Sequence, residues 1–169
     1  GEVDMAWERL NHVPTIAITG TNGKTTVTNM LNYVLKSNGL NTDMGGNIGK
    51  ALSKIALESI NNNQQYLNWL VLELSSYQIE GSPKVEPTIG IWTTFTPDHL
   101  ERHGDIETYF KIKRSLLEKS SIRIYNSDDK SLSRKRKELP QGIWVGIEER
   151  SSYNHHPRFW IDRKGYIYE

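Results

Sequence analysis

The sequence contains no cysteine, and this absence excludes a disulfide framework and any metal site with cysteine ligands. It also has no apolar run of membrane-spanning length and no stretch that resembles a secretory signal. Neither sign of charge is in excess, because 21 basic and 20 acidic residues leave a formal net charge of +1. We therefore expect a cytoplasmic, monomeric protein that binds neither membranes nor nucleic acids.

The length and composition indicate one hydrophobic core, since 169 residues with 36% hydrophobic content suit one main domain with a small appendage. We expect a lead-in or linker over residues 1–13, the main domain over 14–150 and a β-hairpin extension over 151–169. In the extension, His155 and His156 are interpreted as exposed loop residues rather than metal ligands. Because the chain starts with Gly1 rather than Met, we expect it to be a piece of a longer protein.

Short β-rich runs alternate with segments of helical periodicity along the main domain. This alternation predicts an α/β fold with a mostly parallel sheet flanked by helices. Ligands of such folds bind beyond the carboxyl ends of the strands. The predicted strands cover residues 15–18, 69–74, 88–95, 121–125 and 143–147, and the predicted helices cover 25–37, 48–60 and 106–118.

A glycine-rich loop follows the first predicted strand and opens the first predicted helix. Its residues are Gly20, Thr21, Asn22, Gly23, Lys24, Thr25 and Thr26. Glycines allow backbone amides to surround phosphate oxygens, a lysine adds positive charge, and a threonine hydroxyl can bind Mg2+. The order strand, glycine, lysine, threonine, helix therefore predicts a nucleotide triphosphate site, with ATP and Mg2+ as its ligands.

The loop is shorter than the common phosphate-binding motif, because Ile18 stands where that motif has its first glycine. A glycine-rich turn before a helix, with no ligand, is the simpler interpretation of the string alone. The context favours the phosphate loop, since apolar residues at helical spacing follow it and Gly39 ends the helix.

Candidate ligand residues follow two further predicted strands. Glu73 ends the strand over 69–74, at the sheet edge where a phosphate-loop enzyme holds its Mg2+. His99 lies in a polar loop after the strand over 88–95, where a second metal or substrate site would form. The simpler alternatives are an acid that faces solvent and a histidine that only forms hydrogen bonds within its loop.

Lys113 conflicts with its local pattern, because it falls in the middle of the apolar stripe of the helix predicted over residues 106–118. A long lysine side chain at the edge of a core is one explanation. The other is functional: desolvation lowers the pKa of the amine, so that the neutral form becomes available for modification.

Four segments together resemble the central, ATP-binding domain of the Mur ligases, over roughly residues 14–130. The strings at 45–49 and 73–78 are most similar to those of the family member that adds D-glutamate, rather than to sister ligases or folylpolyglutamate synthase. The segments are Gly20–Thr26, Gly45–Gly49, Glu73–Glu80, and Thr96–Gly104 with its continuation to Tyr109 and Lys113.

This resemblance implies a role for each matching residue. Lys24 and the loop amides would hold the ATP phosphates, Thr25 and Glu73 would hold one Mg2+, and His99 with a carbamylated Lys113 would serve a second metal site. Asn47 and Ser75 would face the substrate. The family pattern has Ala-Lys before the modified position, whereas here Ile112 precedes Lys113 and another lysine, Lys111, lies two residues upstream, so Lys111 remains a lesser candidate.

The resemblance also implies a reaction of peptidoglycan synthesis, and hence of cell wall formation, cell shape and cell division. ATP would activate the carboxylate of UDP-N-acetylmuramoyl-L-alanine as an acyl phosphate, which the amine of D-glutamate then attacks. Family members use additional N-terminal and C-terminal domains, so this chain alone is expected to be inactive. The alternatives are another Mur-type or folylpolyglutamate ligase, and a non-catalytic nucleotide-binding module.

Overall fold

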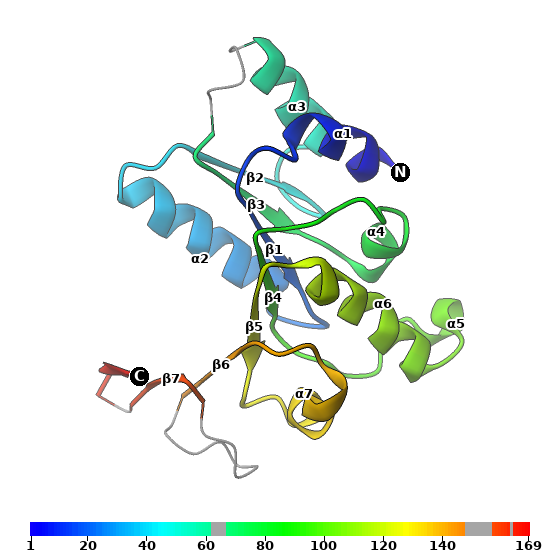
Figure 1. Ribbon diagram of the computed structural model, residues 1–169, viewed down its shortest axis with the longest axis vertical. Helices are drawn as coiled ribbons and strands as arrows, with labels where there is room; N and C mark the ends of the chain where they lie inside the picture. The colour runs from blue at the N-terminus through cyan, green and yellow to red at the C-terminus, as the bar shows by residue number, and fades with distance from the viewer. Residues whose placement is uncertain (62–66, 148–156, 163) are drawn as a thin grey trace.

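The computed structural model describes residues 1–61, 67–147, 157–162 and 164–169. These residues form one sheet of eight strands flanked by helices on both faces (Figure 1). His155 and His156, whose role was predicted from the sequence, lie outside the described residues. Within the described part, no helix combines the length and apolar character needed to cross a bilayer.

The sheet has the strand order β2-β3-β1-β4-β5-β6-β7-β8, and only the final β7-β8 pair is antiparallel. The predicted mostly parallel sheet with a small C-terminal hairpin is thereby confirmed. The strands are β1 (Thr15–Thr19), β2 (Thr42–Gly46), β3 (Trp69–Glu73), β4 (Ile89–Trp92), β5 (Ile122–Asn126), β6 (Ile143–Gly146), β7 (Phe159–Ile161) and β8 (Ile167–Tyr168).

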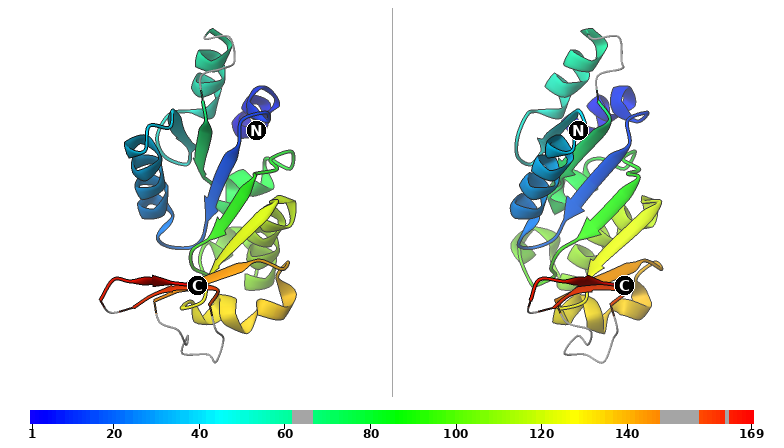
Figure 2. Two further views of the ribbon diagram at one scale, coloured as in Figure 1. Left: turned by 60° about the vertical axis from the view of Figure 1, so that its left-hand side comes forward. Right: turned by 90° about the vertical axis from the view of Figure 1, so that its left-hand side faces the viewer.

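Helices cover the two faces of the sheet unequally (Figure 2). One face carries only α2, and the other carries the remaining helices of the described part. The helices are α1 (Glu2–Leu10), α2 (Lys24–Ser37), α3 (Leu52–Asn61), α4 (Ser76–Glu80), α5 (Leu100–His103), α6 (Ile106–Lys119) and α7 (Lys130–Arg134), followed by the 3-10 turn η1 (Arg136–Glu138).

The hydrophobic core consists of two clusters, one on each face of the sheet, because side chains alternate between the faces of a strand. On β1, Ile16 and Ile18 pack against α2, whereas Ala17 joins the larger cluster on the opposite face. Trp92 and Tyr125 belong to that larger cluster and are fully buried. The strands β4 to β6 are therefore well covered on one face and much less on the other.

The N-terminal segment differs from the predicted lead-in over residues 1–13. It contains helix α1, whose Val3, Trp7 and Leu10 are buried and belong to the larger core cluster. Apolar residues at positions 3, 6, 7 and 10 have the spacing of one helix face, a signal that the sequence did contain. The segment thus helps to build the core rather than only connecting to it.

The parallel topology brings functional segments together at one edge of the sheet. Strand β1 pairs with β3 on one side and with β4 on the other. The loops that follow β1, β3 and β4 therefore leave the sheet next to one another, at the carboxyl edge where parallel sheets bind ligands.

Candidate functional site

The phosphate loop lies directly after β1 and is held by the end of β4. The amides of Thr21 and Asn22 donate to the carbonyl oxygen and the hydroxyl of Thr94, at 2.9 and 2.8 Å. Thr93 donates its hydroxyl to the Asn22 carbonyl at 2.6 Å. The loop is therefore fixed to the centre of the sheet before any ligand binds.

Two glycines make this loop geometry possible. Gly20 has φ +151°, and a Cβ atom there would lie 2.0 Å from the Thr93 hydroxyl oxygen. Gly23 has φ +81° and occupies the N-cap position of α2 without any side-chain cap. The first amides of a helix have no partner within the helix, and the helix dipole makes this end positive. The loop and helix start thus form a site suited to phosphate oxygens.

Lys24 folds its side chain back over the loop. Its ammonium group donates to the carbonyl oxygens of Gly20 and Thr21 at 3.0 and 2.9 Å. The ammonium group therefore lies against the phosphate loop. From there it needs to move only a short distance to contact a phosphate oxygen.

Glu73 is the buried centre of a polar cluster beside the phosphate loop, whose other members, Thr25 and Asn47, are exposed. Its side chain is almost completely buried, and one carboxylate oxygen accepts the Thr25 hydroxyl at 2.8 Å. The other oxygen accepts the Asn47 side-chain amide, also at 2.8 Å. The Asn47 backbone amide donates to the Glu73 carbonyl as well. Three of the predicted residues, from three separate segments, are thus directly bonded.

Glycine at position 46 allows this approach of β2 to Glu73. A Cβ atom at Gly46 would lie 2.3 Å from the Glu73 carbonyl oxygen, and its φ is +95°. The predicted string over residues 45–49 is therefore explained by close backbone contact. It brings Asn47 to the site.

The donor set around Glu73 suits Mg2+. A hydroxyl and a carboxylate are oxygen ligands, and Mg2+ usually takes only one or two protein ligands while phosphates and water complete its shell. Among the described residues no cluster of three or more His, Cys, Asp or Glu could hold a metal ion. The Thr25 hydroxyl and the Glu73 carboxylate thus offer oxygen atoms of the kind that Mg2+ prefers.

Lys113 enters the same site from α6 and is almost completely buried. Its ammonium group donates to the Gly20 carbonyl at 3.0 Å and to the Thr19 hydroxyl at 3.3 Å. Burial lowers its pKa from 10.5 to about 7, helped by the positive charge of Lys24 and opposed by Asp98. The predicted position in the apolar stripe is confirmed, whereas Lys111 is exposed.

His99 is not joined to this cluster by any contact between described residues. It is exposed, and its ring nitrogens lie 3.4 Å from Asp98 and 3.8 Å from Glu101. Its backbone has φ +52°, in the left-handed region that residues other than glycine seldom adopt. Such strain occurs often at functional sites, and the His99 ring also lies 5.2 Å from the ring of Tyr77.

Ser75 serves as the N-cap of α4. Its hydroxyl oxygen accepts the Gln78 amide, and the Gln78 side chain accepts the Ser75 amide, which completes a capping box. The predicted substrate role of Ser75 therefore has to coexist with this structural one.

Sequence reasoning missed the two threonines that directly follow β4. Thr93 and Thr94 supply most of the contacts that hold the phosphate loop. The signal was available, since a Thr-Thr pair at the carboxyl end of an apolar strand places two hydroxyls at the ligand edge.

A largely apolar cavity of about 450 Å³ adjoins the phosphate loop. The loop and α2 line one side of it, and the strand ends of β4 to β6 line the other. Its lining includes Asn22, Gly23, Val27, Ile91, Asn126 and Val145. The cavity is thus continuous with the predicted nucleotide site.

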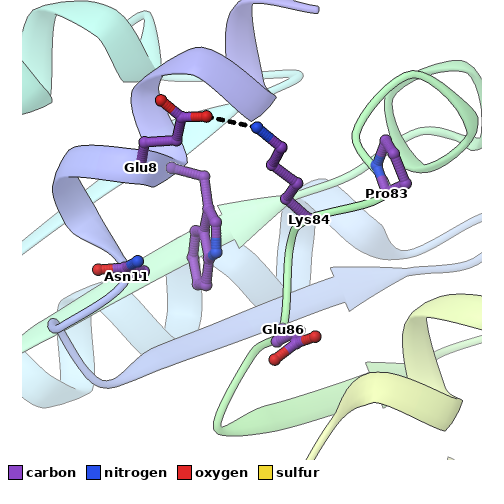
Figure 3. Close-up of a pocket in the computed structure, with 6 residues that line it drawn as sticks. Glu8, Asn11, Pro83, Lys84 and Glu86 are labelled. Atoms are coloured by element: carbon purple, nitrogen blue, oxygen red, sulfur yellow. Dashed lines mark hydrogen bonds and ion pairs between the residues drawn. The ribbon is translucent and has the colours of Figure 1, made fainter.

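A second cleft, of about 510 Å³, lies at the opposite edge of the sheet (Figure 3). It lies between α1 and the segment that leads into β4, and Glu8 and Lys84 form an ion pair across it. None of the predicted site residues lines this cleft. The phosphate loop and Glu73 therefore lie away from this cleft, at the carboxyl edge.

Comparison with known proteins places these features in a family. The Mur ligase middle domain matches residues 18–162. Two UDP-N-acetylmuramoylalanine--D-glutamate ligases of Prochlorococcus marinus, from strains NATL2A and MIT 9313, are 77% and 54% identical over the whole chain. The chain covers 36% and 37% of these relatives.

A solved structure has the same fold. The MurF ligase from Thermotoga maritima, determined in complex with ADP, matches with a TM-score of 0.65 at 24% identity. The match covers 85% of this chain and 35% of that one. The chain thus spans little more than a third of the curated relatives and of this structural neighbour.

Proposed function

The chain belongs to the Mur ligase family, and on that premise we propose that it is the nucleotide-binding part of an ATP-dependent ligase that joins D-glutamate to UDP-N-acetylmuramoyl-L-alanine. The observation that carries this proposal is the union of the phosphate loop with the Thr25–Glu73–Asn47 cluster at one sheet edge. The 77% identity over the whole chain to a D-glutamate ligase supports this amino acid over those of sister ligases.

In the proposed reaction the carboxylate of the L-alanine residue attacks the γ-phosphorus of ATP, and ADP leaves. The resulting acyl phosphate is attacked by the amine of D-glutamate, and the tetrahedral intermediate expels phosphate to leave an amide. The amine loses its proton in this second step. The protein's part is to hold the phosphates, neutralise their charge and align the reacting groups.

The phosphates would lie on the amides at the start of α2, with Lys24 turned from its own loop carbonyls toward them. Thr25 and Glu73 would hold Mg2+, which supplies positive charge to the phosphoryl group. The base of the nucleotide would occupy the apolar cavity between α2 and the strand ends, where Asn22 and Asn126 offer polar groups. Asn47 and Ser75 would face the uridine-linked substrate.

Lys113 would act after reaction with CO2. With a pKa near 7, a useful fraction of its amine is neutral at physiological pH and can attack CO2 to form a carbamate, with loss of a proton. The carbamate keeps one N–H for the Gly20 carbonyl and gains an anionic group. We expect it to form a second metal site with His99, whose loop would have to approach α6. Lys111 is the weaker candidate because it is exposed.

The longer protein would add an N-terminal domain for the uridine moiety and a C-terminal domain that completes the ATP and amino acid sites. Residues 1–169 alone would then turn over no substrate. The alternatives are a ligase for another amino acid or for folate, and a nucleotide-binding module without catalysis.

The test measures phosphate release by the full-length protein with ATP, UDP-N-acetylmuramoyl-L-alanine and each candidate amino acid. We expect release that depends on D-glutamate, that is lost in Lys24→Ala and that persists in Lys36→Ala, which removes an exposed lysine from the other end of α2. Dependence on meso-diaminopimelate or on a folate would overturn the substrate assignment. Unchanged turnover in Lys24→Ala would overturn the phosphate-loop assignment.

A further inference from the structure

A buried histidine behind the site has no role in the proposed reaction. His103, at the end of α5, is 7% exposed, and its Nε2 shares a hydrogen bond of 2.9 Å with the hydroxyl of Ser76. Its ring contacts the rings of Tyr77 and Tyr109, with centroids 5.5 and 5.4 Å away. Three elements, α4, α5 and α6, therefore meet at this imidazole.

The two tyrosines connect His103 with different parts of the site. The Tyr109 hydroxyl lies 3.4 Å from the Thr21 hydroxyl of the phosphate loop, and the Lys113 ammonium lies 4.7 Å above the Tyr109 ring. On the other side, the Tyr77 ring lies 5.2 Å from the ring of His99. His103 thus contacts the aromatic side chains that face Lys113 and His99.

The loop that bears His99 is tied to the phosphate loop at its start, where the Thr96 carbonyl accepts the Thr21 hydroxyl at 3.0 Å and the Thr96 amide donates to that hydroxyl at 3.1 Å, but its later part has fewer attachments. Helix α5 has only four residues, which is too short for a helix to be stable alone, and Gly104 follows it with φ +80°. Across to α4, the contacts of this segment among the described residues are those of His103, the tilted ring contact of His99 with Tyr77, and the exposed contacts of Arg102 with Glu80 and Tyr77. An exposed ion pair contributes little free energy. The buried hydrogen bond is therefore the strongest candidate for the anchor.

An apolar residue could fill this space, yet the position holds an imidazole that must be hydrogen-bonded when buried. Ser76 is also buried, so removing either group takes away the one side-chain hydrogen bond that the described residues provide to the other. A bond of this kind specifies one arrangement of the two helices more strictly than packing alone.

We propose that His103 is a positioning residue of the ligase: its bond to Ser76 and its contacts with Tyr77 and Tyr109 fix the His99 loop relative to the phosphate loop and Lys113. This inference rests on the proposed function for its effect on catalysis. The anchoring itself depends only on the geometry.

Three variants of the full-length protein separate the contacts. His103→Phe keeps a ring between the tyrosines but removes the hydrogen bond, Ser76→Ala removes the same bond from the other side, and His103→Gln keeps a donor and acceptor but no ring. We expect His103→Phe and Ser76→Ala each to lower kcat about tenfold while KM for ATP changes less than about twofold. The phosphate loop keeps its contacts to Thr93 and Thr94, which explains the unchanged KM.

The double variant and the glutamine variant test the bond itself. We expect His103→Phe with Ser76→Ala to be no slower than either alone, because both remove one interaction. His103→Gln should recover part of the lost kcat. Wild-type kcat in both folded single variants, or effects that multiply in the double variant, would overturn the proposal. If His103→Phe does not fold, Ser76→Ala decides, since it removes only one oxygen atom.

A second readout does not assume the reaction. Hydrogen exchange of the amides of residues 102–104, which donate within α5, should be faster in His103→Phe and Ser76→Ala and unchanged in Lys36→Ala. Unchanged exchange in the first two variants would refute the anchoring even if the ligase assignment holds. Faster exchange in a protein that shows no D-glutamate-dependent turnover would support the anchoring and refute the proposed function.

Discussion

At the scale of the residue, the buried amine of Lys113 makes the stability of the fold depend on pH. In the unfolded chain this amine has the ordinary lysine pKa of 10.5, and in the folded protein burial lowers the pKa to about 7. Between these values the unfolded state binds more protons, so the free energy of unfolding rises as the pH rises from about 7 toward 10. Below pH 7 the full cost of burying the amine is present.

We predict that Lys113→Met raises the free energy of unfolding near pH 7 by a few kcal/mol, since each unit of pKa shift corresponds to about 1.4 kcal/mol. The same variant should lose the rise in stability between pH 7 and 10, and it should be catalytically inactive. Urea unfolding in CO2-free buffer measures both effects. Lys111→Met is the control and should change neither, and a wild-type pH slope in Lys113→Met would contradict the assigned burial cost.

At position 20, the surrounding atoms and the backbone conformation require glycine. We predict that Gly20→Ala costs about 2–4 kcal/mol, because the new methyl group would overlap the Thr93 hydroxyl and the backbone has φ +151°. The matched control is Gly39→Ala, where φ is +78° but no atom lies within 4 Å of the added Cβ. It should cost only about 1 kcal/mol. Equal losses in thermal or urea unfolding would mean that contact with Thr93 does not matter.

At the scale of the element, the short helix α4 depends on its first residue. We predict that Ser75→Ala destabilises the protein by about 1 kcal/mol through loss of the cap, whereas Ser75→Asn keeps the cap and nearly the full stability. If Ser75 also faces the substrate, both variants should raise KM for the uridine-linked substrate. Thermal unfolding combined with steady-state kinetics separates the two roles. If Ser75→Asn restores both the stability and the KM of the unmodified protein, Ser75 has only the structural role.

The elements that the sequence predicts well are the long helices with clear periodicity and the short strands that form nearly continuous apolar runs. The helices α2 and α6 and the strands β1, β3 and β6 begin and end within about one residue of their predicted bounds. β2 was missed because Thr42–Gly46 contains two glycines and an aspartate, residues that strands seldom contain. Tertiary contact with Glu73 holds it there. The helices α4, α5 and α7 were missed because four or five residues are too few to show a period.

In the candidate site, too, some features could be predicted from the sequence and others could not. Spacing in the sequence identified Lys24, Thr25 and Glu73, since each follows from the order of strand, loop and helix. It could not reveal that Lys24 and Lys113 share the Gly20 carbonyl, because that contact depends on how α6 crosses the sheet. Nor could it reveal the separation of His99 from the other candidates, which depends on the path of an irregular loop.

At the scale of the whole molecule, the uneven covering of the sheet leaves apolar side chains accessible beside α2. Ile122 is 44% exposed, and Met30 and Val34 on α2 are 62% and 51% exposed. The neighbouring Ile124 and Val145 are half-buried on the same face. A parallel sheet is normally covered on both faces, so this half-open face is unusual for its fold class.

We predict that residues 1–169 bind the apolar dye ANS in their native state, because contiguous exposed apolar surface of this kind attracts such ligands. Ile122→Lys should lower the dye fluorescence without lowering the unfolding temperature by more than a few degrees, since the side chain is exposed. Ile167→Lys, on the terminal hairpin, is the control and should have little effect, although Ile167 is 77% exposed. Native-state fluorescence at the level of a dye-free background would show that the face is closed in solution.

The central position of β1 in the sheet couples unfolding of the nucleotide site to unfolding of the sheet. The strand that leads into the phosphate loop is bonded on both sides, to β3 and to β4, and every one of its residues is buried. A site at a sheet edge or on a flap can fray while the rest of a protein survives. Here the phosphate loop can unfold only when the central strands of the sheet unfold. Partial denaturation therefore cannot leave a folded protein in which the phosphate loop alone is disordered.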